Sequence, residues 1–171
     1  MSLKSFEMKT YIMVDIESNG PIPGDYSMTS LGAVIVDDKL DKAFKINIKP
    51  ISEKFDPDRR QFVNEKDAVD AKEAMQKFKS WILKNSSGTP VFISDNNGFD
   101  WMFVCWYFWH FLGENPFGYN SHNLNSLYKG LKKDLHAKLD FLRERNLTHD
   151  ALEDAKDNAK IFHELRKRFK C

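Results

Sequence analysis

The stretch YIMVDIE, from Tyr11 to Glu17, is rich in β-branched and aromatic residues and is followed closely by Gly20. This composition predicts a first β-strand. Because side chains alternate along a strand, Asp15 and Glu17 project from one face, with Cα atoms about 6.6–7 Å apart. The apolar residues between them project from the opposite, buried face. Since two neighbouring carboxylates repel unless a cation joins them, the strand is a candidate wall of a divalent-metal site. With 25 acidic residues in the chain, chance is the other explanation.

The segments around this strand predict an α/β fold with a mixed sheet of about five strands flanked by helices. Period-2 and turn signals predict further strands at 31–36 and 43–48, which complete an antiparallel meander, and a short buried strand at 90–94. Helical spacing of apolar residues predicts helices at 66–84, 99–112, 125–131 and 134–143, and a last helix from about Asp150. Residues 115–123 are expected to be irregular.

A second polar group, Asn96-Asn97-Gly98-Phe99-Asp100, falls between a predicted strand and a predicted helix. Loops at this position of α/β sheets often carry ligands. Asp100 lies in the first turn of the helix, where the helix dipole favours an anion, so an ordinary helix-starting role is the alternative to a ligand. Asn96 is likewise a common turn residue.

A third group surrounds the start of the last predicted helix. Asp154 lies in its opening turn, beside a stripe of small residues that would let the helix approach the sheet closely: Ala151, Ala155 and Ala159. His149 precedes the helix, and an imidazole can exchange protons near neutral pH, as a general base must. A solvent-facing loop histidine is the alternative. Asp150 is expected to cap the helix.

Composition is typical of a soluble globular protein. The 171 residues include 42% hydrophobic and 30% charged residues, with a net charge of +1. We expect one domain over residues 1–171, with residues 1–9 partly flexible. Two cysteines, Cys105 and Cys171, lack disulfide or metal-ligand spacing, which favours reduced thiols and a cytoplasmic location. The longest apolar run, residues 101–112, is too short to span a bilayer, so no membrane association is expected.

The three acidic motifs occur in a characteristic order: D-x-E, then N-x-x-F-D, then H-x-A-x-x-D. Together they resemble the DEDDh-type 3′–5′ exonuclease superfamily, which has a ribonuclease H-like fold. The similarity extends from Tyr11 to about Phe162. It is strongest to small ribonuclease-T-like exoribonucleases of bacteria.

This resemblance implies a site and an activity. Asp15, Glu17, Asp100 and Asp154 match the four acidic positions that hold two Mg²⁺ or Mn²⁺ ions per active site, and His149 matches the general base. The implied reaction is the hydrolysis of single-stranded nucleic acid, with RNA favoured, from a free 3′ end to nucleoside 5′-monophosphates. The resemblance also allows a homodimer, for which no stretch of the sequence identifies an interface.

Four residues are expected to contact the substrate: Ser18, Asn96, Phe99 and Tyr119. Ser18 follows the D-x-E motif, and Tyr119 lies in a glycine-containing loop where a ring could stack on a base. Two other functions stay open from the sequence: a single-stranded DNA exonuclease, and a non-catalytic nucleic-acid-binding module. Dependence on divalent metal separates the last from both enzymes, because simple phosphate binding persists in chelator and weakens with salt.

Overall fold

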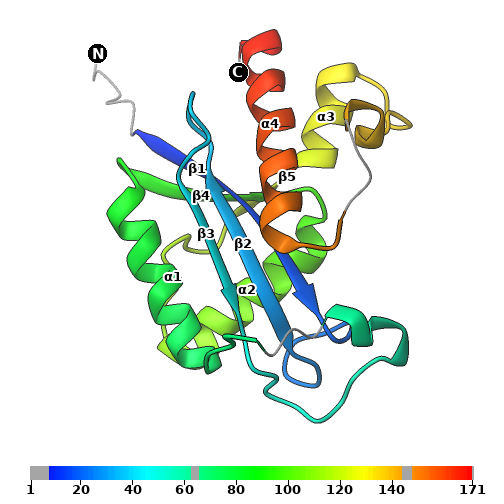
Figure 1. The fold of residues 1–171 in the computed structure, drawn as a ribbon. Helices are drawn as coiled ribbons and strands as arrows, with labels where there is room; N and C mark the ends of the chain where they lie inside the picture. Colours follow the sequence, from blue (N-terminus) through cyan, green and yellow to red (C-terminus); the bar gives the residue numbers. More distant parts are fainter. Residues whose placement is uncertain (1–7, 63–65, 144–147, 171) are drawn as a thin grey trace.

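The computed structural model describes residues 8–62, 66–143 and 148–170. Its centre is a five-stranded mixed sheet in the order β3-β2-β1-β4-β5 (Figure 1). The first three strands form the predicted antiparallel meander, and β4 and β5 continue it in parallel with β1. The strands are β1 Lys9–Ser18, β2 Met28–Ile35, β3 Ala43–Asn47, β4 Thr89–Ser94 and β5 Ser121–Asn123. The predicted fold class is confirmed.

Helices cover both faces of the sheet (Figure 1). Helices α1 (Ala71–Asn85) and α2 (Asn97–Leu112) pack on one face, and α3 (Leu124–Lys132) and α4 (Ala151–Phe169) pack on the other. Two short 3₁₀ helices, η1 (Pro57–Phe62) and η2 (Leu139–Leu142), lie in the connections. Within the described residues, no helix is both long enough and apolar enough to cross a membrane.

Strand β1 divides the core in two. Ile12, Val14 and Ile16 are buried against the α1 and α2 layer, whereas Met13 is buried against the α4 layer. Since side chains alternate along a strand, Asp15 and Glu17 share the face of Met13. Both carboxylates are therefore directed to the side of the sheet that α4 covers.

The start of α4 lies unusually close to the sheet. A Cβ atom added at Gly32 of β2 would lie 2.3 Å from the backbone of Ala151, so only glycine permits this contact. The three alanines of the predicted stripe are all buried. This close approach lets the short side chain of Asp154 reach β1, which confirms the packing expected from the stripe.

Several sequence predictions require correction. The first helix begins at Ala71 rather than at 66, because Asp67 adopts a positive φ of 57° and Val69 pairs with Ile48 in an isolated bridge. The helix predicted at 134–143 is wrong, since only η2 forms there. The segment buries Leu139 in the core without forming an α-helix, whereas its apolar residue Leu135 is 81% exposed. Strand β5 and helix η1 were not predicted.

Two further sequence predictions concern the N-terminal segment and the cysteines. Partial flexibility was expected over residues 1–9, but Lys9 already belongs to β1, and positions 1–7 lie outside the described residues. Cys171 also lies outside them, and Cys105 carries a free thiol.

Candidate active site

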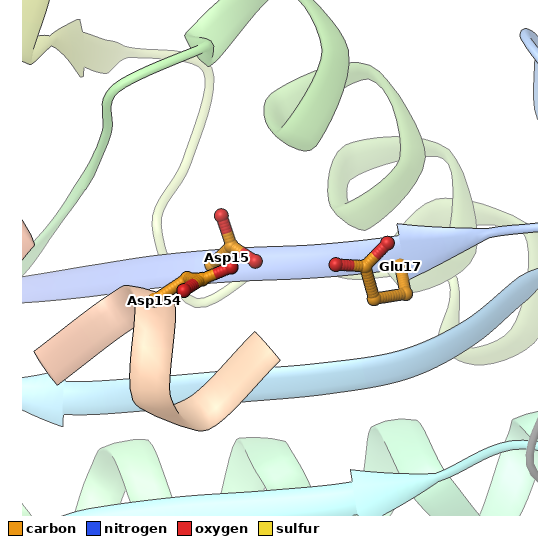
Figure 2. Close-up of side chains that lie close together, drawn as sticks. All are labelled: Asp15, Glu17 and Asp154. Carbon is orange, nitrogen blue, oxygen red and sulfur yellow. The ribbon is translucent and has the colours of Figure 1, made fainter. Parts of the chain in front are cut away.

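Three predicted acidic residues meet on one side of β1. Asp15 and Glu17 project from the strand, and Asp154 reaches them from the first turn of α4 (Figure 2). One carboxylate oxygen of each lies within 4.8 Å of the others. The alternation of β1 and the close packing of α4 are thus sufficient to build this half of the site.

A second acidic group shares Asp15 with the first. Its other members are Asp100, at the start of α2, and Asp95, in the loop before α2, again with oxygens within 4.8 Å of one another. The pairing of β4 with β1 ends before Asp15 is reached. Its last pair is Ile93 opposite Met13. Asp95 follows two residues later, directly after the end of β4 at Ser94, and its carboxylate lies near that of Asp15. Asp15 therefore lies between two carboxylate groups.

Asp95 was not among the predicted site residues. In the sequence it reads as part of a turn, and only its place directly after a buried strand could have indicated it. Its side chain is 12% exposed and pairs with Arg143, whose Nη2 lies 2.6 Å from Asp95 Oδ2. Arg143 follows η2, in the region where the sequence predicted a helix at 134–143.

The crowded carboxylates are electrostatically strained without a cation. Burial, and next the charges of Asp100 and Asp95, raise the pKa of Asp15 well above its usual value. Burial and the charge of Asp95 do the same to the pKa of Asp100. Burial, followed by the charge of Asp154, raises the pKa of Glu17 to about 7. Each shift reports that ionisation here is unfavourable unless positive charge is supplied.

The residues present fit hard divalent cations. All donors in the two groups are carboxylate oxygens, the ligands preferred by Mg²⁺ and Mn²⁺. Asp100 is 2% exposed, and its buried Oδ2 atom has no hydrogen-bond partner among the described residues. A buried carboxylate oxygen without a donor is costly, and a bound cation would satisfy it.

Arg59 of η1 is a second residue that the sequence did not indicate. Its guanidinium lies 5.2 Å from the ring centroid of Phe99, and its charge lowers the pKa of Glu17 against the larger effects that raise it. The loop that carries it is tied to the end of β1, because the N–H of Asp56 donates to the carbonyl of Asn19. A cation thus borders the acidic groups on the Glu17 side.

The segment before α4 places His149 beside Glu17. His149 Nδ1 lies 3.9 Å from Glu17 Oε1, and the imidazole is more than half exposed. Asp154 fixes the segment by accepting hydrogen bonds from the backbone N–H groups of Thr148 and His149. Asp150 caps α4 by accepting from the N–H groups of Leu152 and Glu153, as predicted.

The four residues predicted to contact the substrate differ in burial and in their neighbours. Ser18 is buried and its hydroxyl donates to the carbonyl of Gly20. Asn96 is exposed at the start of α2, and Phe99 is half-buried beside Arg59. Tyr119 is 80% exposed and stacks on Trp109, in the C-terminal half of α2, so the structure does not bring it to the carboxylates.

Comparison with known proteins adds to this geometry. The family model of the 3′–5′ exoribonuclease Rv2179c-like domain matches residues 10–166. The chain belongs to this exoribonuclease family. It is also similar to the 3′–5′ DNA exonuclease Cap18 of Escherichia coli, with 36% identity over 179 residues that cover 94% of each protein. This member of the Rv2179c-like family is therefore a 3′–5′ exonuclease, and the resemblance found in its motifs is confirmed.

Solved structures show the fold of this exonuclease in other proteins. The nuclease domain of 3′hExo, a DEDDh family member bound to rAMP, matches 97% of this chain and 95% of its own, with a TM-score of 0.74 and 14% identity. E. coli exonuclease I in complex with single-stranded DNA matches 95% of this chain with the same TM-score and 14% identity. The chain spans 41% of the exonuclease I chain. Family membership implies dependence on divalent metal.

Proposed function

We propose that this chain removes nucleotides from the free 3′ end of single-stranded nucleic acid with two divalent ions, Mg²⁺ or Mn²⁺. The products are nucleoside 5′-monophosphates. The observation that carries the proposal is that Asp15 belongs to both carboxylate groups. A carboxylate with two oxygens between two acidic groups suits a centre that holds two ions side by side.

The carboxylates divide between the two ion positions. Asp15, Glu17 and Asp154 would hold one ion, and Asp15 with Asp100 would hold the other. When bound, the ions supply positive charge that stabilises the attacking and leaving oxygens of the phosphodiester. The chain itself contributes the placement of these groups, since β1, α2 and α4 each fix one part of the set.

His149 is the proposed general base. Its imidazole would accept a proton from the attacking water, and the neighbouring carboxylate of Glu17 would stabilise the imidazolium that results. Exposure of the ring leaves room for water and substrate. The hydrogen bond from its backbone N–H to Asp154 holds the base in register with the metal ligands.

RNA is the first candidate substrate, because the family is described as exoribonucleases. Single-stranded DNA is the second candidate, because the similar protein Cap18 is named a DNA exonuclease. Ser18, Asn96 and Phe99 are proposed to contact the terminal nucleotide, and exposed Tyr119 to contact a base farther along the strand. A cytoplasmic location and a homodimer stay predictions from the sequence.

The direct test is digestion of matched 5′-labelled RNA and DNA oligomers. Each would be incubated with Mg²⁺, with Mn²⁺ or with chelator, using Asp15→Asn as the inactive control. We expect metal-dependent shortening, faster on RNA, and no activity in the variant. Faster shortening of DNA would assign the second substrate. Binding of both oligomers in chelator, without cleavage in either metal, would support a non-catalytic binding module instead.

A further inference from the structure

Asp95 is an acidic residue of the site to which neither the motif resemblance nor the proposed function gives a role. It directly follows β4, and its carboxylate lies with those of Asp15 and Asp100 within 4.8 Å. The side chain is only 12% exposed. A carboxylate placed this deep beside two others is either offset by a cation or is part of a cation site.

Arg143 provides one such cation. Its Nη2 lies 2.6 Å from Asp95 Oδ2, and its side chain is only 7% exposed. The other oxygen, Asp95 Oδ1, accepts a hydrogen bond of 2.7 Å from the N–H of Asn96. Since each carboxylate oxygen has two lone pairs, both oxygens keep acceptor capacity after these contacts. These two contacts therefore fix the orientation of the Asp95 carboxylate and leave both of its oxygens able to bind a cation.

A second observation points to a ligand at the same place. Asp100, nearly fully buried, has an Oδ2 atom with no hydrogen-bond partner within the part of the chain that the structure describes. Arg143 does not neutralise Asp100 through any ion pair that the structure records, since its partners are Asp95 and Asp140. Within residues 8–62, 66–143 and 148–170, no ion pair neutralises Asp100, so a bound divalent cation would satisfy its Oδ2 atom.

We propose that Asp95 is a fifth carboxylate of the metal centre, a ligand for the divalent ion on the Asp100 side, with Arg143 as its positioning residue. This inference rests on the proposed function. The charges support it, because five carboxylates carry five negative charges, and two divalent ions with Arg143 supply five positive charges. Without Arg143, a fifth carboxylate would leave the buried centre with excess negative charge.

Calorimetric titration of chelator-treated protein with Mn²⁺ tests the proposal without any activity measurement. Wild type should bind two ions. Asp95→Asn keeps the size of the side chain and removes its charge, so one of the two ions should lose at least about tenfold in affinity. Asp140→Asn is the matched control, because exposed Asp140 also pairs with Arg143, through Nε at 3.2 Å, but lies outside both carboxylate groups. Its Mn²⁺ affinities should equal those of wild type.

A further variant separates ligation from a merely structural ion pair. Arg143→Lys keeps one positive charge but loses the planar donors that reach Asp95 and Asp140 together. It should lower the affinity for the same ion as Asp95→Asn does, by a smaller factor. Thermal unfolding in chelator shows whether Asp95→Asn folds, and if it does not, Arg143→Lys replaces it in the test. Two ions bound by Asp95→Asn with wild-type affinities would overturn the proposal, as would unchanged affinities in Arg143→Lys where that variant alone folds. An equal loss in Asp140→Asn would also overturn it. Absence of Mn²⁺ binding by wild type would instead remove the proposed function itself.

Discussion

Asp154 Oδ2 accepts a hydrogen bond of 2.9 Å from the backbone N–H of His149. Oδ1 of the same carboxylate accepts from the backbone N–H and the hydroxyl of Thr148. His149 adopts a left-handed conformation, with φ of 57°, which costs roughly 1–2 kcal/mol for a residue with a Cβ atom. The proposed metal ligand therefore also holds the proposed base in a backbone conformation that it would not adopt freely.

Substitution of Asp154 should consequently affect both parts of the site. In Asp154→Asn an amide –NH₂ replaces one acceptor, so it would face an N–H donor of Thr148 or His149. We expect hydrolysis to fall by more than about 100-fold, beyond the usual cost of losing an outer partner of a metal ligand. Amide hydrogen exchange at residues 148–149 should become faster. Asp157→Asn, later on α4, is the control, and an equal effect there would contradict this dual role.

His149→Ala should separate catalysis from metal binding. Loss of a general base lowers turnover by about 10²–10⁴-fold. Mn²⁺ affinity, measured by calorimetry, should change little, because the imidazole is not among the proposed ligands. His110→Ala, an exposed histidine stacked on Trp106, should behave as wild type. If Mn²⁺ binding disappeared with His149, the ring would have to be reassigned as a ligand.

Glu17 should make the metal-free protein less stable as pH rises. Burial, and then Asp154, raise its pKa from 4.5 to about 7. Between these values the folded state holds more protons than the unfolded state, so the free energy of unfolding decreases with rising pH. The contribution is fully present below pH 4.5 and lost above about pH 7.

Thermal unfolding in chelator from pH 5 to pH 8 measures this effect. Glu17→Gln lacks the titrating group. The melting temperature of the variant minus that of wild type should therefore increase as pH rises. Saturating Mn²⁺ should reduce the difference, because a cation favours the ionised carboxylate. Parallel pH profiles for the two proteins would show that Glu17 titrates normally in the fold.

The sequence predicted those parts of the site that depend on local geometry. Alternation along one strand was enough to place Asp15 and Glu17 on one face, and a capping pattern located the start of α4 at Asp150. These features repeat every two residues or lie within one helical turn, so they can be read without knowledge of the tertiary structure.

The missed residues depend on contacts between distant segments. Asp95 enters the site directly after β4, whose pairing with β1 stops at Ile93, and Arg143 reaches it from a connection 48 residues away in sequence. Arg59 depends on the anchoring of η1 to the end of β1. The incorrect helix at 134–143 has a related cause, since helical spacing does not reveal whether a neighbouring surface exists to bury Leu135.

Gly32→Ala tests whether close packing of α4 positions Asp154. The added Cβ would lie 2.3 Å from backbone atoms of Ala151 and Leu152, so α4 must shift. We expect a loss of about 1–3 kcal/mol in the free energy of unfolding, measured with denaturant, and weaker Mn²⁺ binding. Gly130→Ala in α3 is the control, because a Cβ there meets nothing within 4 Å and helix propensity favours alanine. Unchanged Mn²⁺ affinity in a destabilised Gly32→Ala would argue that the helix position is not critical.

The requirement for a free 3′ end distinguishes an exonuclease from an endonuclease that uses the same ions. A terminal 3′-hydroxyl held near β1 places no charge beside Asp15 and Glu17, whereas a 3′-phosphate would bring a dianion against two carboxylates. A 5′-labelled single strand should therefore shorten stepwise to a ladder with 5′-mononucleotides as products, and the same strand with a 3′-phosphate should resist. A covalently closed single-stranded circle should not be cut. If wild type linearised the circle and Asp15→Asn did not, the metal centre would be shown to cut internally. The requirement for a free 3′ end would then be wrong, while the assignment of the metal site would stand.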